Sequence, residues 1–387
     1  MTHSMAITKL KMGMVGGGQG AFIGAVHRIA AQLDNQIELV CGAFNQNPDD
    51  AIASGLSFGL PKSRCYGSYK EMFIEEQKLP DTERMDLVAI VTPNHLHYDI
   101  AKLAIEHGFH VISDKPATLN LNQAIALSET IAKHNSLYAL THTYSGYPMV
   151  KEAKHRIKQH ELGEIRKVVV NYPQGWLSQP TDETNKQAAW RLNPEMAGIS
   201  CCIADIGVHG AHLAEYISGL TISHVCADLT TTVAGRYLDD DGTVMLRFSN
   251  GAKGVLLASQ IATGEENNLT ISLYGEKASL HWSQESPNSL IKKYPNQSSE
   301  IIRTGVGNLC AITQSNTRLP AGHPEGYIEA FANIYLNFAQ QIHALKHQLV
   351  PPTSALDVPD IEDAIRGMTF IERVVQASES DKKWHKI

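Results

Sequence analysis

Apolar residues follow different periods in the first and the second part of the chain. Up to residue 145, short continuous apolar runs alternate with segments in which apolar residues recur every three or four positions. Continuous runs are typical of buried parallel strands, and the longer period is typical of amphipathic helices. We therefore predict an α/β domain with a doubly wound parallel sheet. Its expected strands cover residues 12–15, 37–44, 85–91, 109–113 and 137–141, and its expected helices include 94–107 and 121–134.

A glycine-rich turn joins the first expected strand to the first expected helix. Residues 16–21, GGGQGA, fit the pattern G-x-G-x-x-G/A, with Ala21 as the third small residue or, if the loop carries an insertion, Gly24. Such a turn lets the backbone approach a pyrophosphate at the positive end of the helix. An ordinary βα turn is the alternative when the motif is taken alone. The residues expected to bind a dinucleotide here are Gly16, Gly18, Gln19, Gly20 and Ala21.

The end of the second expected strand bears on the choice between NAD and NADP. NAD-binding units place an acid there, which holds the adenine ribose. Asn45 stands at this position, so the repulsion of a 2′-phosphate is missing, and no arginine follows to attract one. Both dinucleotides stay open as cofactors, and we favour NAD.

Two further strand ends carry candidate cofactor-binding residues. Open α/β sheets bind ligands at the carboxyl ends of their strands. Thr92, Pro93 and Asn94 follow the strand 85–91, with Asn94 as the expected N-cap of the next helix and His97 in its first turn. A polar or capping role is the ordinary interpretation of His97.

Asp114 and Lys115 follow the strand 109–113 in the same way. A solvated surface lysine is the ordinary interpretation of such a residue. Its place at a strand end, together with the glycine turn, makes Lys115 a candidate for chemistry as well as for cofactor binding.

After residue 145 strand patterns dominate. We expect strands over 167–172 and 225–233 and two hairpins, one turning at Ser249-Asn250-Gly251 and the other at Gly275-Glu276. This predicts an α+β domain over residues 146–387 with an open, mainly antiparallel sheet, after a dinucleotide-binding domain over 1–145. A basic helix over 151–160 is expected to present a solvated face, and helices over 327–342 and 360–377 are expected to close the chain.

Asp205 and His209 are the candidate acid and base groups of the second domain. In a helix that starts near Ile203 they would share one face, four residues apart. A carboxylate beside an imidazole fixes its tautomer, as a general base requires. A surface pair is the alternative, and His212 is expected to be structural. The candidate substrate-binding residues are Tyr144, Trp190, Arg191, for which a structural salt bridge is the alternative, and His323.

Composition narrows the class of protein. The 387 residues are 43% hydrophobic and 19% charged, and the net charge of −7 without a basic block argues against a nucleic-acid partner. Six cysteines show no metal-ligand spacing, so no metal site is predicted. The chain shows no export signal and no long apolar run, which predicts a cytoplasmic protein that does not contact a membrane.

Taken together, the motifs resemble those of the Gfo/Idh/MocA oxidoreductases. The glycine turn, Val91–Asn94 with His97, the triplet Asp114–Pro116 and the segment Asp205–His209 occur in the order seen in that family. Family members carry Glu-Lys-Pro where this chain has Asp-Lys-Pro, and their glycine turn is a few residues shorter.

The resemblance implies an NAD(P)-dependent dehydrogenase. The enzyme would act on a secondary hydroxyl of a sugar, inositol or related polyol, with Lys115, Asp205 and His209 as its catalytic residues. It would form a homodimer or homotetramer through the second sheet, and its last helix would pack back near the first domain. One alternative is an NAD-dependent glycoside hydrolase with Tyr144 or Tyr172 as an additional base. The other is a non-catalytic dinucleotide-binding regulator.

Overall fold

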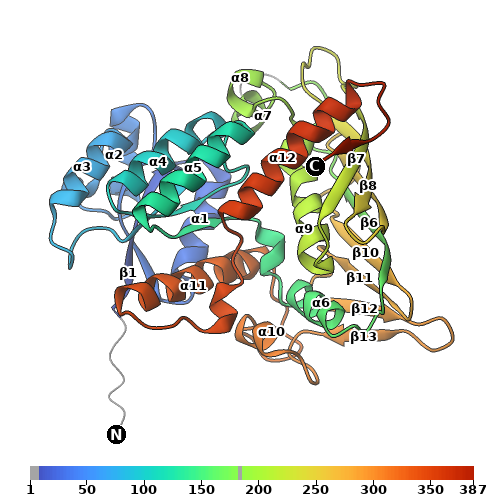
Figure 1. Ribbon diagram of the computed structural model, residues 1–387. Coiled ribbons are helices and arrows are strands. Elements are labelled where there is room, and N and C mark those ends of the chain that lie inside the picture. The colour runs from blue at the N-terminus through green and yellow to red at the C-terminus, as the bar shows by residue number, and fades with distance from the viewer. Residues whose placement is uncertain (1–7, 182–184) are drawn as a thin grey trace, which may run out of the picture.

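The chain forms two sheets side by side with helices between and around them (Figure 1). The structure is a computed structural model that describes residues 8–181 and 185–387. Most of the amino-terminal stretch in which we expect no export signal lies outside these residues. Within them, no helix combines the length and the apolarity needed to cross a bilayer.

The first sheet has five parallel strands in the order β2-β1-β3-β4-β5, which confirms the predicted doubly wound sheet. Its strand order changes direction between β1 and β3, where such sheets bind ligands. Residues of β3 alternate between the two covered faces, which explains its continuous apolar run. The strands are β1 (Leu10–Gly16), β2 (Ile37–Ala43), β3 (Leu87–Val91), β4 (His110–Ser113) and β5 (Tyr138–Leu140).

Helices cover both faces of this sheet. One core contains apolar residues of α1 and α11, and the other contains those of α3, α4 and α5. Asn94 does not cap α4, because a 3₁₀ turn (Asn94–Leu96) precedes that helix. The helices are α1 (Phe22–Leu33), α2 (Pro48–Ser57), α3 (Tyr69–Lys78), α4 (His97–Glu106), α5 (Leu121–His134) and α11 (Tyr327–Lys346), with short 3₁₀ turns at Lys62–Arg64 and Thr143–Gly146.

The second sheet has nine strands in the order β13-β12-β11-β10-β6-β9-β8-β7-β14. All neighbours are antiparallel except β6 and β9, and both predicted hairpins are present. Three short strands, β12, β13 and β14, had no clear pattern in the sequence. The strands are β6 (Ile165–Pro173), β7 (Ile222–Thr230), β8 (Asp241–Phe248), β9 (Lys253–Ser259), β10 (Thr270–Gly275), β11 (Ser279–Ser283), β12 (Ser289–Lys293), β13 (Glu300–Arg303) and β14 (His385–Lys386).

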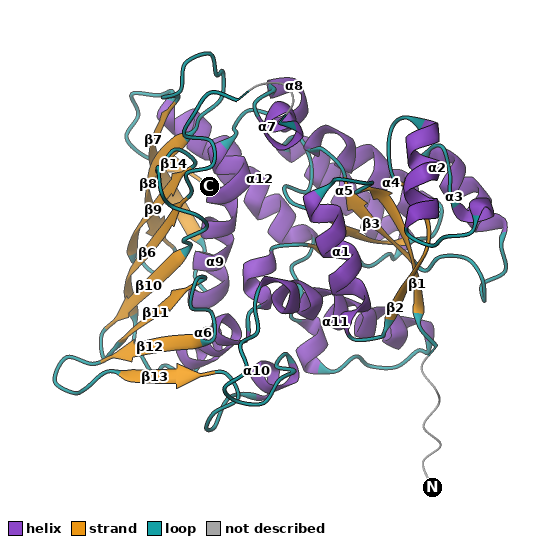
Figure 2. Cartoon of the chain, turned by 180° about the vertical axis from the view of Figure 1, so that it is seen from behind, coloured by secondary structure: helices purple, strands orange, loops and turns teal. Residues whose placement is uncertain are grey.

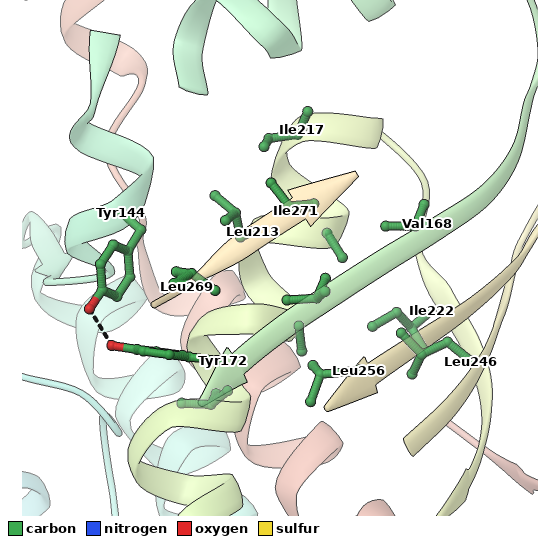
Figure 3. Packing of buried hydrophobic residues seen from close by; sticks show 14 of the residues in the cluster. Tyr144, Val168, Tyr172, Leu213, Ile217, Ile222, Leu246, Leu256, Leu269 and Ile271 are labelled. Atoms are coloured by element: carbon green, nitrogen blue, oxygen red, sulfur yellow. Dashed lines mark hydrogen bonds between the residues drawn. The ribbon is translucent and has the colours of Figure 1, made fainter. Parts of the chain in front are cut away.

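One face of the second sheet packs on helices that lie between the two sheets (Figure 2). Its core joins apolar residues of α9 to those of β6, β9 and β10, as the close view shows for Leu213, Val168 and Leu256 (Figure 3). The helices of this half are α6 (Pro148–Lys158), α7 (Lys186–Arg191), α8 (Pro194–Ala197), α9 (Val208–Ser218), α10 (Ala311–Ser315) and α12 (Ile361–Ser378), with a 3₁₀ turn at Thr353–Leu356.

The two carboxyl-terminal helices tie the halves together, since α11 packs on α1 and α12 packs on α5. The expectation of a solvated face on α6 was wrong at Lys151, which is buried and bonds to Asp357 at 2.6 Å. Burying a lysine requires such a charged partner. The domain boundary at residue 145 stays a prediction.

Candidate active site

Two cavities meet beside the carboxyl ends of the first sheet. One, of about 550 Å³, follows the glycine turn and the ends of β2 and β3. The other, of about 570 Å³, lies between the first sheet and the ends of β6 and α9. The first is called the turn cavity and the second the inner cavity. Both are lined by Ile23, Asp114, Lys115, Gln187 and Arg191.

The glycine turn lines the turn cavity with backbone. Gly17 has a φ of 69°, a conformation that favours glycine. A Cβ atom on Gly24 would lie 2.4 Å from the Cα of Gly17, so Gly24 is the small residue that lets α1 pack on the turn. The sequence left Ala21 and Gly24 open as the third small residue of the glycine motif, and the geometry therefore favours Gly24. Ala21 precedes α1, whose first turn has no side-chain cap among the described residues.

This cradle fits a dinucleotide. Uncapped N–H groups at a helix start attract a phosphate, and glycines keep side chains out of its way. All but one of the residues expected to bind the cofactor line the turn cavity: Gly16, Gly18, Gln19, Gly20, Ala21, Asn45, Thr92, Pro93, Asn94, Asp114 and Lys115.

His97 is the exception, because it is buried and lines neither cavity. Its Nδ1 lies 2.7 Å from the carbonyl of Pro116 and its Nε2 lies 2.8 Å from that of Thr92. The ring therefore ties together the two loops that follow β3 and β4. Asn94 also plays a different part from the expected cap, since its amide donates to the carbonyl of Ala197 at 3.0 Å.

Lys115 and Asp205 come from different halves of the chain and meet in the inner cavity. The Nζ of Lys115 donates to the backbone carbonyl of Asp205 and, at 3.0 Å, to its Oδ1. Oδ2 of Asp205 accepts from Gln260 at 2.9 Å and lies 3.2 Å from Nε of Arg191. Burial alone would raise the pKa of Asp205, but the charges of Arg191 and Lys115 outweigh it and hold that pKa well below its usual range.

The expected pairing of Asp205 with His209 is not what the structure shows. Residues Ile203–Gly207 form a π turn before α9, and a π turn advances by a different angle per residue than an α-helix. The carboxylate is therefore directed at Lys115, Arg191 and Gln260 instead of the imidazole. His209 lines the same inner cavity.

His209 is buried and its ring has two aromatic neighbours. Its Nδ1 lies 3.4 Å from Nδ1 of His142, and the ring of Tyr144 lies edge-on at 4.9 Å. Burial first, and the charge of Lys115 next, hold the pKa of His209 well below its ordinary value. A neutral imidazole at neutral pH is the form that accepts a proton.

Arg191 sits at the junction of the two cavities. Its guanidinium lies 4.2 Å from the ring centre of Trp190 and pairs with Asp205. Arg191 was expected either to bind substrate or to form a structural salt bridge. The structure supports both roles, because the side chain pairs with Asp205 and also lines the inner cavity. Trp190 lines the turn cavity and not the inner one.

Several lining residues of the inner cavity had no signal in the sequence. They come from α1, α7, the π turn before α9, the start of α11 and the strand ends and loops of both sheets, which only the three-dimensional fold brings together. Tyr144 and Tyr172 share a hydrogen bond between their hydroxyls (Figure 3), and Tyr172 donates to Asn267 at 2.8 Å. The residues missed are Phe22, Ile23, Thr141, Thr143, Gln174, Trp176, Gln187, Ile206, Asn267, Gln284 and Tyr327.

The structure does not bring His323 to this cleft. It lies on an exposed turn, with Nδ1 3.2 Å from the carbonyl of Pro320, and lines neither cavity. We therefore leave it out of the proposed site.

A parallel sheet with a phosphate-binding turn, joined to a cavity that holds a lysine, a carboxylate and a neutral histidine, defines the class of dinucleotide-dependent oxidoreductases. Comparisons with known proteins agree. The family described as "Oxidoreductase family, NAD-binding Rossmann fold" matches residues 10–142, and the "GFO/IDH/MocA C-terminal domain" matches residues 150–281. The chain belongs to the Gfo/Idh/MocA oxidoreductase family.

Individual relatives match most of the chain. An uncharacterized oxidoreductase of Bacillus subtilis, YfiI, is 33% identical over 97% of this chain and 96% of its own length. Levoglucosan dehydrogenase of Pseudarthrobacter phenanthrenivorans is 27% identical over 73% of this chain and 75% of its own length.

Among solved structures, an inositol dehydrogenase homolog of Azotobacter vinelandii in complex with NAD⁺ has a TM-score of 0.94. It is 31% identical, and the match covers 98% of both chains. The same homolog in complex with NADH and myo-inositol has a TM-score of 0.91, at 30% identity and the same coverage. The predicted family, fold class and NAD-binding domain are thereby confirmed.

Proposed function

We propose that this protein is an NAD(P)-dependent dehydrogenase that oxidises a secondary hydroxyl of a sugar, inositol or related polyol. The observation that carries the proposal is the meeting of Lys115 and His209, from different halves of the chain, in a cavity that adjoins the glycine turn. The relatives named for levoglucosan and complexed with myo-inositol support a polyol as the substrate class.

The lining of the inner cavity also supports a neutral, hydroxyl-rich substrate. Amide and hydroxyl groups dominate its polar side chains, and such groups pair with both the donor and the acceptor of an alcohol. Its arginine is already paired with Asp205, which leaves less positive charge for an anionic substrate. The lining residues with amide or hydroxyl side chains are Thr141, Thr143, Tyr144, Tyr172, Gln174, Gln187, Asn267, Gln284 and Tyr327.

In this mechanism Lys115 holds the reacting oxygen. An ammonium group has three N–H donors. Asp205 accepts two of them, one at its carbonyl and one at Oδ1, so one N–H is left for a substrate oxygen. A fixed positive charge at that oxygen stabilises the negative charge that develops as its proton leaves.

His209 accepts that proton at Nε2. The substrate O–H bond breaks and an N–H bond forms, and the oxidised nicotinamide, when bound, would supply the acceptor for the hydride of the carbinol C–H bond. The lowered pKa of His209 keeps the ring unprotonated beforehand. Asp205 positions Lys115 and Arg191 instead of orienting the imidazole.

The hydrolase alternative is less well supported by the geometry. It would use Tyr144 or Tyr172 as a base, which requires a deprotonated phenol. Burial raises the pKa of both hydroxyls, so both stay protonated as donors at neutral pH.

The test is a turnover assay of the purified protein with NAD or NADP and a panel of sugars, inositols, polyols and glycosides. We expect net formation of the reduced dinucleotide, with one equivalent of carbonyl product. Release of an aglycone without net change in the dinucleotide would establish the hydrolase instead. Dinucleotide binding without turnover of any compound would favour the regulator.

We also propose that the open face of the second sheet forms a homo-oligomer. Met245 on β8 and Leu257 on the adjacent β9 are exposed there, as is Tyr274 on β10, which β6 separates from β9, and exposed apolar side chains of this kind contribute to protein interfaces. Light scattering of the purified protein tests this: a dimer or tetramer is expected, and a monomer that persists at high concentration would contradict it.

A further inference from the structure

His209 lacks the orienting carboxylate that the sequence predicts for it. Both carboxylate oxygens of Asp205 bond to other groups, namely Lys115 on one side and Gln260 with Arg191 on the other. A histidine that serves as a base through one ring nitrogen needs a partner at the other, because that partner decides which nitrogen carries the hydrogen. The structure offers a different partner for this purpose.

The partner is His142, which follows β5 of the first sheet. Its Nδ1 lies 3.4 Å from Nδ1 of His209, with the two rings at 80°, and both residues are buried. Hydrogen bonds of catalytic groups are often long in structures without substrate. Nε2 of His209 has no hydrogen-bond partner in the part of the chain that the structure describes, and His209 borders the inner cavity.

His142 is itself held firmly. Its ring stacks on that of His212 at 4.1 Å between ring centres and 6° between planes. Nε2 of His212 lies 3.5 Å from Oδ1 of Asp363 on α12. The carbonyl of His142 accepts a hydrogen bond of 2.8 Å from the hydroxyl of Ser145. Segments from both halves of the chain therefore fix the position of His142 relative to His209.

Two neutral imidazoles that face each other through Nδ1 have two possible arrangements. If His209 donates, its Nε2 carries a lone pair and accepts a proton from the cavity. If His142 donates, the Nε2 of His209 carries a hydrogen and cannot act as a base. Nε2 of His142 is buried without a partner among the described residues in either case, so it does not decide between them.

The charge of Lys115 decides between the two arrangements. Its ammonium borders the cavity that His209 also lines. A lone pair directed to the cavity is attracted by this charge, whereas an N–H dipole there would be repelled.

We propose that His142 is a positioning residue for His209: it accepts the Nδ1–H of His209 and thereby directs the unprotonated Nε2 into the inner cavity. The catalytic part of this inference rests on the proposed function. When the substrate proton moves to Nε2, His209 becomes an imidazolium and keeps its Nδ1–H bond to His142.

His142 accepts this hydrogen bond without taking over the proton. Burial first, then the charges of His212, His209 and Lys115, hold the pKa of His142 well below its ordinary value. The titratable groups around the pair of His142 and His209 are His212 and Lys115, with Asp205 and Tyr144 on the His209 side and Asp363 behind His212. A neutral His142 accepts a hydrogen bond but does not carry the proton away.

The direct test is ¹⁵N nuclear magnetic resonance of histidine-labelled protein at neutral pH, in which protonated and unprotonated ring nitrogens have distinct shifts. The signals of His209 are those missing from the His209→Gln protein. We expect His209 to carry its hydrogen on Nδ1. A hydrogen on Nε2 would overturn the proposal, whatever the protein turns out to catalyse.

Two variants separate positioning from packing. In His142→Leu the acceptor is gone, so we expect kcat to fall by about tenfold to a hundredfold with KM within about twofold. In His142→Asn the side-chain oxygen replaces the Nδ1 acceptor, and most of kcat should return together with the Nδ1–H tautomer. His27→Leu is the matched control, since His27 is also buried and bonded through Nδ1, at 2.6 Å to Tyr335, away from both cavities.

The outcomes are distinct. Equal loss of kcat in His142→Leu and His142→Asn, with the His209 tautomer unchanged in both, would overturn the positioning role. The Nδ1–H tautomer in a protein that turns over no polyol would support the positioning role and contradict the proposed function.

Discussion

The glycine turn and the Lys115–His209 cluster are built by opposite means. The turn is local: one strand, six residues and one helix shape a backbone cradle, and Gly24 allows the close packing of α1 on Gly17. The cluster consists of Lys115 after β4, His142 after β5, Asp205 in the π turn and His209 in the first turn of α9. The glycine turn should therefore tolerate changes elsewhere in the chain, whereas the geometry of the cluster depends on the contacts between both halves.

The largest effect is expected when Lys115 is removed, because this changes the cluster and leaves the glycine turn intact. In Lys115→Met the positive charge at the reacting oxygen is lost, and kcat should fall by roughly 10² to 10⁴-fold. Dinucleotide affinity should stay within a few-fold, because the glycine turn is intact. Steady-state kinetics and calorimetric titration with NADH measure both quantities. Near-normal turnover would remove the role given to Lys115.

The reverse experiment disturbs the packing of the glycine turn and leaves the residues of the cluster unchanged. A Cβ on Gly24 would lie 2.5 Å from the carbonyl oxygen of Gly17, so Gly24→Val should cost about 1–3 kcal/mol in folding and weaken dinucleotide binding. Thermal unfolding with and without NADH measures this. Gly59→Ala is the control: its positive φ also costs folding stability, but nothing lies within 4 Å of the added Cβ and Gly59 lines neither cavity. If Gly24→Val binds NADH as tightly as this control, the assigned role of Gly24 is wrong.

A smaller effect is expected at Asn45, where a substitution tests which part of the turn cavity holds the adenine ribose. Asn45 is exposed at the end of β2 and lines that cavity. Asn45→Asp adds an acceptor for the ribose hydroxyls and repels a 2′-phosphate, so the preference for NAD over NADP should rise about tenfold, or about 1.4 kcal/mol. The ratio of kcat/KM values for the two cofactors measures it. An unchanged ratio would mean that the ribose lies elsewhere.

The smallest expected effect concerns pH and the cluster. Because the pKa of His209 is lowered, its base form persists below the ordinary histidine value of about 6.5. The kcat/KM of oxidation should therefore stay level as the pH falls through that value, and decline only at lower pH. In Asp205→Asn a charge that raises the pKa of His209 is lost, so the decline should move to still lower pH. A decline in the wild type centred near 6.5 would contradict this environment for His209.

The sequence predicted the first sheet well because its strands carry their own signal. Strands such as β3 are buried on both faces and must be apolar throughout. In the second sheet, β6 and β7 were predicted from their apolar patterns, and two hairpins were predicted from their turn residues. The short strand β13 is largely exposed and carries no such pattern.

Three residues of the cluster, Lys115, Asp205 and His209, were predicted from the sequence, but the contacts between them were not. Asp239 accepts hydrogen bonds from the N–H groups of Cys201 and Ile203 at 2.9 Å each, and so holds the start of the π turn from a distant part of the chain. Helical spacing assumes a regular helix, which is why Asp205 was expected beside His209. His142 was missed for a similar reason, since only the packing of both halves brings it to His209.

A crystal structure of the protein with NADH and a polyol that it turns over tests the central claim most directly. We predict that one oxygen of the polyol lies within hydrogen-bond distance, about 2.6–3.2 Å, of both Nζ of Lys115 and Nε2 of His209. A polyol bound elsewhere, or with no oxygen shared by these two groups, would contradict the account.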